Sequence, residues 1–340
     1  MNTAKRRSGS ISSYILVSLL SFIIFNVAAS VCSADSYLLY KEAQFVLGSE
    51  LKSSTGIFYS QSQNDVMQKP SIGLDYIYKF SDDTGDKAVL YTQARLALNE
   101  QGNTRKIEPQ LYNAYIKFKN PLSDLWIGHA RVPYGLSSYL DSHAQLLPPL
   151  GMYDLGFERD WGAGLARDMP WGDIAVSYTT GSGMPLYAAS NHLSSARISY
   201  GVLSSDNFNV GLSKINGTSV MAMGYEVMPE ALYNIDLTGI DSAVLYENYE
   251  LRAETSSGSR MGEDYRSSFI RAGIKLLDEE LLKIEIQQVS YTQGNETDHI
   301  GAVCVSYLYD ENTALRLIYQ NDELLDDIKI VGQVYHYSPW

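Results

Sequence analysis

Ionisable side chains gather in two parts of the chain, where together they could sort solutes by charge. Cations stand at alternate positions of neighbouring segments and are predicted to share one face of a sheet. They are Arg95, Lys117, His129 and Arg131. The long connection 133–158 contributes Asp141, His143, Asp154 and Glu158. A row of cations opposite an acidic loop sets up a local field that orders water and favours polar solutes.

Residues for bond-making chemistry do not occur at the spacings that common enzyme motifs require. The five histidines are scattered, without the spacing of a zinc site, and the sequence has no Gly-x-Ser-x-Gly elbow and no phosphate-binding loop. We therefore expect no enzyme activity, no metal and no cofactor. A hydrolase site assembled from distant strands stays open as an alternative, because such a site leaves no local motif.

The segments that position these side chains alternate between apolar and polar residues over about ten positions. In 71–80, Ile72 and Leu74 share one face while Asp75 and Lys79 lie on the other. The segments 88–99 and 315–320 repeat the pattern. Since side chains alternate across a strand, one face can meet lipid and the other a watery lumen. The pattern is typical of a transmembrane β-barrel.

Connections between these segments alternate in length. Short ones are predicted at 81–87, 120–124, 168–172, 204–206, 247–248, 277–281 and 310–312. Longer ones are predicted at 61–70, 100–109, 133–158, 181–192, 216–238, 257–265, 293–298 and 321–327. The alternation predicts about 16 antiparallel strands, with short periplasmic turns, long extracellular loops and both ends of the barrel on the periplasmic side. An extra strand within 217–239 stays open, so the predicted count ranges from roughly 14 to 18.

A barrel of this size leaves room for an aqueous channel. Its longest loop, 133–158, follows the fifth strand and contains turn-forming residues such as Gly135, Pro148 and Pro149. Long ordered loops are usually functional. We expect this loop to fold into the barrel and narrow the lumen, and an exposed extracellular flap is the alternative.

The N-terminal residues predict export. Lys5, Arg6 and Arg7 precede an apolar stretch over 14–31, and small residues lead up to Ala34. This pattern predicts a signal peptide, 1–34, that is cleaved after Ala34 and leaves a single barrel domain over 35–340. An uncleaved membrane anchor and a lipoprotein tethered at Cys32 are weaker alternatives.

Charge and composition exclude other classes of protein. Cleavage would remove three of the 26 lysine and arginine residues and none of the 39 acidic ones, which takes the formal charge from −13 to −16. Such an acidic chain lacks the basic surface needed to bind nucleic acid. No segment after the signal peptide approaches the ~18 apolar residues of a helical membrane span. A soluble β-sandwich would not need 26 tyrosines, whereas the aromatic girdles of a barrel would.

Alternation places further charged residues on the predicted lumenal face. The cations are Arg197, Arg252, Arg271, Lys275 and Arg316, and the acids include Asp75, Asp160, Glu250, Glu254 and Glu285. Selectivity therefore does not follow from net charge. Any one of these residues could equally belong to an internally compensated ion pair of a generic polar wall.

Three short segments carry a resemblance to a known family. The segment 126–136 reads Trp-Ile-Gly-His-Ala-Arg-Val-Pro-Tyr-Gly-Leu and resembles the strand that runs into the constriction loop of phosphate-selective (O and P) porins. Segments 178–183 (Tyr-Thr-Thr-Gly-Ser-Gly) and 249–254 (Tyr-Glu-Leu-Arg-Ala-Glu) are similar to two later strand ends of that family. The resemblance implies a homotrimeric, 16-stranded channel. Residues 133–158 contain neither lysine nor arginine, so phosphate specificity is not carried over.

These observations predict an outer-membrane porin of a Gram-negative bacterium, an all-β barrel through which small hydrophilic solutes or ions diffuse passively. The expected partners are those solutes and the lipid and lipopolysaccharide of the outer membrane. Two other functions stay open: a closed structural or adhesive barrel, and the barrel-embedded hydrolase. Alternation and loops look alike in all three cases.

Overall fold

The computed structural model of the chain describes residues 36–50, 69–101, 104–138, 145–202, 207–223, 226–277, 280–323 and 327–340. The predicted signal peptide, Asp141 and His143 lie outside these residues. Within the described part, no helix is both long and apolar enough to span a bilayer.

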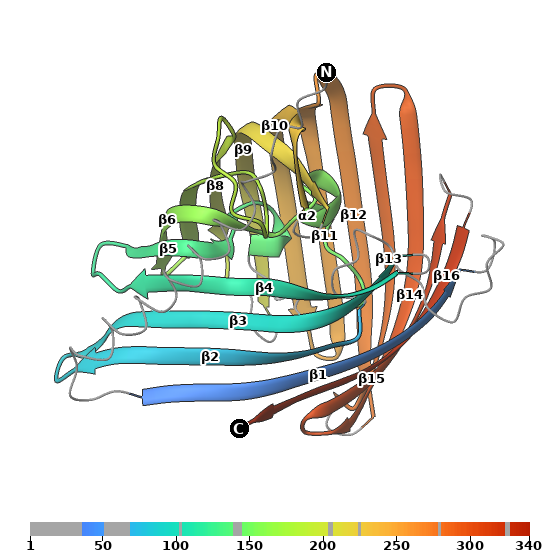
Figure 1. Cartoon of the computed structure of the whole chain (residues 1–340), viewed down its shortest axis with the longest axis horizontal. Coiled ribbons are helices and arrows are strands. Elements are labelled where there is room, and N and C mark those ends of the chain that lie inside the picture. Colours follow the sequence, from blue (N-terminus) through green and yellow to red (C-terminus); the bar gives the residue numbers. More distant parts are fainter. Residues whose placement is uncertain are drawn as a thin grey trace, which may run out of the picture.

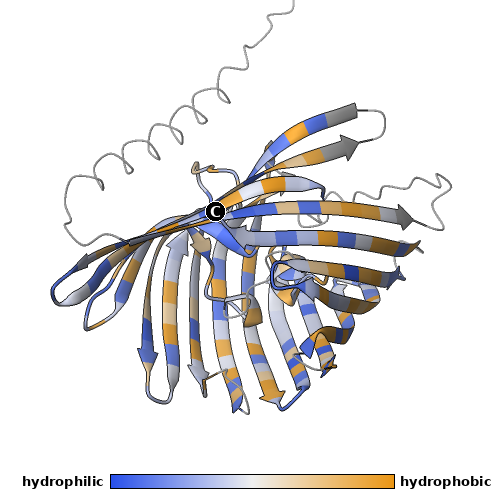
Figure 2. Ribbon diagram, turned by 90° about the horizontal axis from the view of Figure 1, so that it is seen from below, coloured by the Kyte–Doolittle hydropathy of each residue, from blue (hydrophilic) through white to orange (hydrophobic). Residues whose placement is uncertain are grey.

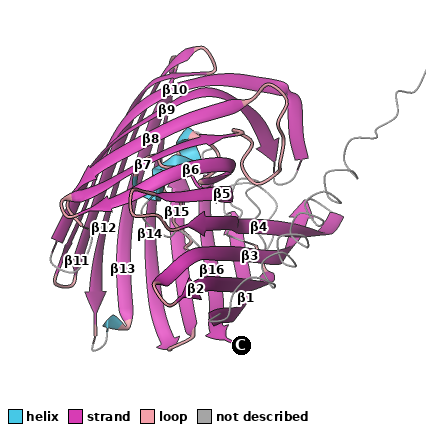
Figure 3. Cartoon of the chain, turned by 90° about the vertical axis from the view of Figure 1, so that its left-hand side faces the viewer, coloured by secondary structure: helices cyan, strands magenta, loops and turns pink. Residues whose placement is uncertain are grey.

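Sixteen antiparallel strands form one closed barrel, as the sequence predicted (Figures 1 and 3). They are β1 (Ser36–Glu50), β2 (Ser71–Asp82), β3 (Gly85–Gln101), β4 (Thr104–Phe118), β5 (Asp124–Arg131), β6 (Arg159–Met169), β7 (Gly172–Thr179), β8 (His192–Tyr200), β9 (Asn207–Met223), β10 (Glu226–Tyr246), β11 (Tyr249–Arg260), β12 (Glu263–Leu276), β13 (Leu282–Gln293), β14 (Glu296–Asp310), β15 (Thr313–Asp322) and β16 (Asp327–Pro339). Each strand pairs with its neighbours in sequence, and β1 pairs with β16 to close the ring.

Closure brings the start of β1 beside the end of β16. Tyr40 lies opposite Pro339, and the Trp340 amide donates to the Leu39 carbonyl over 2.9 Å. The tight turns, such as 170–171 and 311–312, lie at this same end, which we call the turn end. The opposite, loop end holds the connections 132–158 and 180–191. The predicted alternation of connections is confirmed in its order.

Several connections are shorter than predicted. Residues 216–238, expected to form a long loop, belong almost wholly to β9 and β10, with a register shift between Val227 and Leu232. Residues 100–109, 257–265 and 293–298 are likewise largely strand. No extra strand lies in the described part of 217–239. The prediction was wrong there because these strand ends carry polar side chains on their outer face. Asn216 donates to Asp236 on the neighbouring strand, for example.

Hydrophilic and hydrophobic residues alternate along many of the strands (Figure 2). Along β8 every second residue from Leu193 to Ser199 is buried and the others are exposed. On β2, Ile72 and Leu74 lie on the outer face and are exposed. Asp75, the next residue, lies on the inner face and is buried. This assignment agrees with the faces predicted from the sequence. The barrel therefore has an apolar outer surface and a polar inner one.

Candidate functional site

The connection between β5 and β6 folds into the barrel. It contains the short helices η1 (Leu136–Ser138) and α2 (Leu150–Asp154), and α2 lies inside the ring of strands (Figure 3). The described parts of this inserted loop, 132–138 and 145–158, are mostly buried. The prediction of a constriction loop is therefore confirmed, and the alternative of an exposed flap is wrong.

An apolar face fastens the inserted loop to one side of the lumen. This docked face consists of Tyr134, Leu136, Leu146, Leu147, Leu150 and Leu155, all nearly inaccessible to solvent. Tyr134 and Leu155, at the root of the loop, pack against inward residues of β8, β9, β10 and β12. Leu136 and Leu150, in its middle, pack against β10, β12, β13 and β14. Leu146 and Leu147 pack against β14, β15, β16 and β1. Burying each such leucine stabilises the docked loop by roughly 1.5–3 kcal/mol.

Hydrogen bonds fix the root of the inserted loop on β9 and β11. The Leu136 amide donates to Glu254 Oε2 over 3.2 Å, and the Tyr134 hydroxyl donates to Ser256 Oγ over 2.7 Å. The Gly135 amide reaches Ser213 Oγ at 3.3 Å. Gly135 has a φ of +60°, and the Glu254 carboxylate occupies the space that a Cβ would need. Two of the segments that resemble the phosphate-selective porins, 126–136 and 249–254, thus meet in space.

The third of those segments supports the neighbouring loop. Asp160 on β6 is completely buried and accepts hydrogen bonds from the amides of Ser182 at 3.1 Å and Gly183 at 3.0 Å, and also from the Gly181 amide. The Thr180 hydroxyl donates to the same carboxylate over 2.9 Å. Successive amides that converge on an anion form a concave nest. Asp160 is therefore a structural anchor for the connection 180–191.

Arg271 on β12 holds the far end of the inserted loop. Its guanidinium donates to the Leu147 carbonyl over 2.9 Å, to the Pro148 carbonyl over 3.4 Å and to Gln145 Oε1 over 3.2 Å. Two further bonds reach Gln287 Oε1. Carbonyl and amide oxygens thus satisfy this buried cation. Arg271 was predicted to line the lumen, and the structure makes it a clamp on the loop.

Asp154 at the end of α2 is fully buried beneath the loop. It accepts a hydrogen bond from the Tyr265 hydroxyl over 3.1 Å and lies 3.5 Å from the Tyr134 hydroxyl. Burial raises the pKa of its carboxyl above the ordinary value near 3.8, because the charged form loses hydration. Hydrogen bonds from serine and tyrosine hydroxyls and the charge of Arg260 oppose that shift.

Docking of the inserted loop is therefore expected to depend on pH. Because the pKa of Asp154 is raised in the docked loop, the docked loop binds more protons than a released one. Docking therefore weakens as the pH rises from the ordinary pKa of the carboxyl through its raised pKa. Single-channel recordings from mildly acid to mildly alkaline pH should show more open-channel noise at high pH. Asp154→Asn should flatten that dependence, because the amide cannot ionise. Wild-type noise that is constant over this range would contradict the assignment.

The wall opposite the docked face is polar. The Arg95 guanidinium on β3 donates to Gln110 Oε1 over 2.6 Å and lies 3.7 Å from Glu42 Oε1. The Tyr112 ring lies between two arginines, with its centroid 4.7 Å from Cζ of Arg95 and 5.6 Å from Cζ of Arg159. Stacking on an aromatic ring in this way holds both guanidinium groups in place.

The other predicted cations on this side do not form one continuous row. Lys117 forms an ion pair at 3.5 Å with Asp124 near the turn end, seven positions along β4 from Gln110, the partner of Arg95. Seven strand residues span roughly 23 Å, so Lys117 and Arg95 are not neighbours. His129 is buried, with Nδ1 2.9 Å from the Tyr112 carbonyl oxygen. Arg131 is partly buried at the loop end of β5.

The remaining predicted cations have close polar partners. Arg197 is bound to Asp241, Arg252 is paired with Glu250, and Arg316 donates to Gln333 Oε1 over 2.7 Å. In the inserted loop, Glu158 pairs with Arg159 at 3.0 Å. The alternative of compensated ion pairs therefore describes much of this wall. Among the described residues, no group of histidine, cysteine or acidic side chains is suited to hold a metal ion.

Sequence reasoning missed Tyr112 and Arg260 as lumenal residues. In β4, Asn113 pairs with Gln93 and Leu111 pairs with Ala94, so Tyr112 lies in the register shift between them. Simple alternation therefore assigns Tyr112 to the wrong face. Arg260 ends β11 inside a segment that was expected to be a loop. A signal for Arg260 was present, because it continues the inward series of Arg252, Glu254 and Ser256 at even positions.

No family model matches the chain, and no curated protein matches it. Solved structures do match it. An anion-selective porin from Comamonas acidovorans has a TM-score of 0.63 at 10% identity, over 90% of this chain and 100% of that one. OmpF of Salmonella typhi, in complex with daunomycin, has a TM-score of 0.63 at 9% identity, over 89% and 97%. OmpT of Vibrio cholerae in its trimer form has a TM-score of 0.63 at 11% identity, over 90% and 100%. The chain is thus similar in fold to porins, as a closed 16-stranded antiparallel barrel.

Proposed function

We propose that the chain is an outer-membrane channel through which small hydrophilic solutes diffuse passively. The observation that carries the proposal is the inserted loop, which is docked on one side of a closed 16-stranded barrel and leaves a polar wall opposite. The apolar outer face suits a bilayer. Outer-membrane barrels have short turns on the periplasmic side and long loops on the extracellular side, so the turn end would be periplasmic and the loop end extracellular. The likeness in fold to several porins supports the same function.

We also propose that the channel is a homotrimer in contact with lipid and lipopolysaccharide. The resemblance to phosphate-selective porins implies a trimer, and the matching OmpT structure is described as a trimer form. The same resemblance would imply phosphate selectivity. We do not propose that, because residues 133–158 contain no lysine and no arginine.

We propose that most of the side chains predicted from the sequence act on passing solutes, and that they contribute unequally to selectivity. On the wall they are Arg95, Lys117, His129, Arg131, Arg197, Arg252 and Arg316, and on the inserted loop Asp141, His143 and Glu158. Arg271 and Asp154, which were also predicted, instead hold the inserted loop in place. Cations whose charge is already compensated contribute less to selectivity. We therefore expect Arg316, which donates to the neutral amide oxygen of Gln333, to matter more than Arg197, whose charge is matched by the buried carboxylate of Asp241.

The test is conductance in a planar bilayer. Refolded protein that shifts its gel migration on heating should give ohmic current steps, and a salt gradient should give a reversal potential that shrinks at high salt, because charges are then screened. Arg316→Gln should move the reversal potential towards cation selectivity, with Lys214→Gln on the outer face as control. Folded, heat-modifiable protein without current steps would overturn the channel.

A further inference from the structure

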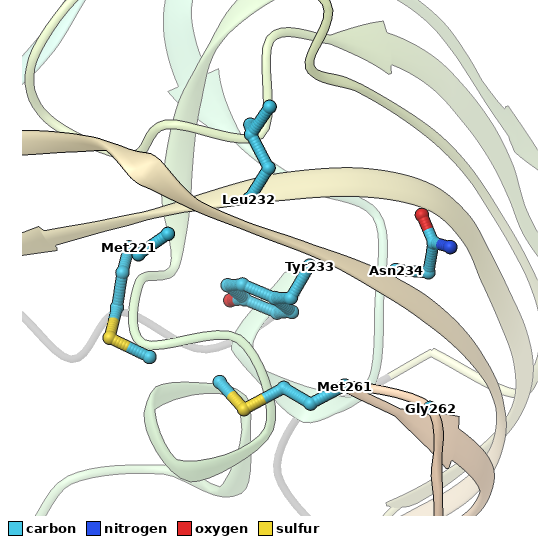
Figure 4. Close-up of a pocket in the computed structure, with 7 residues that line it drawn as sticks. Met221, Leu232, Tyr233, Asn234, Met261 and Gly262 are labelled. Carbon is cyan, nitrogen blue, oxygen red and sulfur yellow. The ribbon is translucent and has the colours of Figure 1, made fainter.

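A cavity opens at the loop end of the barrel, beside the inserted loop. It has a volume of about 460 Å³ and lies between the ends of the β9–β10 and β11–β12 hairpins. Its lining residues are Met221, Ala231, Leu232, Tyr233, Asn234, Met261 and Gly262 (Figure 4). Cavities of 300–1,000 Å³ are the usual size of small-molecule sites. The volume is therefore suited to a molecule of one ring or a short chain.

The lining is apolar and adaptable. Met221 and Met261 point their ends toward each other below Tyr233 (Figure 4), and Met221 and Leu232 are both more than a third exposed. Methionine side chains adjust to ligands of different shape. The hydroxyl of Tyr233 donates to the Leu155 carbonyl of the inserted loop over 3.3 Å, which holds the ring in place. The cavity thus offers a fixed aromatic ring and two flexible thioethers.

A cation stacks on that ring. The guanidinium of Arg260 is held between two tyrosines, with Cζ 5.8 Å from the Tyr233 centroid and 5.4 Å from the Tyr265 centroid. Its Nε is buried without a hydrogen-bond partner, and among the described residues no carboxylate forms an ion pair with it. The Asp154 carboxyl beneath the inserted loop feels the charge of Arg260 but forms no ion pair with it, and a partly buried cation that lacks a direct ion pair favours the approach of an anion. Arg260 therefore gives the apolar cavity a preference for anions over neutral molecules.

We infer that this cavity is a capture site for small amphipathic organic anions, such as aromatic monocarboxylates, at the extracellular mouth of the channel. The apolar body of the solute occupies the space between Met221, Leu232 and Met261, and its carboxylate is drawn to Arg260. The inference rests on the proposed function, because it names a class of solute that the channel would concentrate before passage. Neutral solutes of the same shape lack the electrostatic attraction, and small hydrophilic anions lack the apolar contact.

The test measures binding separately from current. The full channel in lipid nanodiscs is titrated calorimetrically with benzoate, benzyl alcohol and acetate. Benzoate should bind more tightly than either of the others. Arg260→Gln should weaken benzoate binding by roughly tenfold, the size expected for a charged hydrogen-bonding partner, and Arg260→Lys should retain part of it. Arg266→Gln is the matched control, because Arg266 is an exposed arginine near the same end of the neighbouring strand.

The outcomes separate the two ideas. Equal binding of benzoate and acetate, or unchanged benzoate binding in Arg260→Gln, would overturn the capture site even if the channel conducts. Tight benzoate binding that depends on Arg260 in a protein that carries no current would uphold the site and overturn the proposed channel. A Met221→Ser, Met261→Ser double variant provides a second check, since it should lower affinity for benzoate without changing the response to acetate.

Discussion

Replacing Gly135 by alanine should release the root of the inserted loop and raise the single-channel conductance. A Cβ at this position would lie 1.6 Å from Glu254 Oε1, and the φ of +60° disfavours any side chain. The strained backbone alone costs roughly 1–3 kcal/mol, and the collision displaces the carboxylate that receives the Leu136 amide. The measurement is conductance of the folded protein in planar bilayers, with current noise recorded as a sign of loop motion.

The inserted loop offers a matched control for this substitution. Gly156 also has a positive φ, +82°, but a Cβ there would meet nothing within 4 Å. Gly156→Ala therefore adds backbone strain without the collision, and its conductance should stay near the wild-type value. Glu254→Ala in the Gly135→Ala background should relieve the collision and separate it from backbone strain. Wild-type conductance and noise in Gly135→Ala would show that Glu254 does not fix the loop.

Much of the barrel could be predicted from the sequence because alternation is a local property. Every second residue of a strand faces the same side, so Asp75, Arg197 and Glu254 could be assigned to the lumen without knowledge of their neighbours. The order of short turns and long loops could be predicted in a similar way, from the lengths of the connections between the alternating segments. Strand lengths could not be predicted at the loop end. There the outer side chains are polar, so hydropathy no longer marks the strand.

The contacts of the candidate site could not be predicted, because they depend on register and on residues far apart in sequence. Leu136 and Glu254 are 118 positions apart, and Arg271 lies 124 positions from the Leu147 carbonyl that it holds. The register shift in β4 turns Tyr112 toward Arg95. Such a shift leaves no simple mark in one sequence. Whether a predicted lumenal charge faces solute or is compensated by a partner follows only from these contacts.

Arg197 provides the clearest case of a compensated charge, and its removal should strongly destabilise the barrel. Its guanidinium binds both carboxylate oxygens of Asp241, at 2.6 and 3.1 Å, and also donates to Asn209 over 2.7 Å. The side chains of Arg197 and Asp241 are 1% and 0% exposed. Arg197→Met leaves Asp241 as a buried charge without its main partner, which costs about 3–5 kcal/mol. Urea unfolding of the refolded protein in lipid vesicles measures the loss.

The double variant Arg197→Met, Asp241→Leu tests whether the loss comes from the stranded carboxylate. Replacing a buried pair by apolar residues of similar volume is often neutral, so the double variant should recover most of the stability that Arg197→Met loses. The exposed pair of Lys214 and Asp236 on β9 and β10 is the matched control, with side chains 50% and 47% exposed. Lys214→Met should cost less than about 1 kcal/mol, because water already solvates both charges. If Arg197→Met were no less stable than Lys214→Met, water would have to reach Asp241, and this part of the wall would be open lumen.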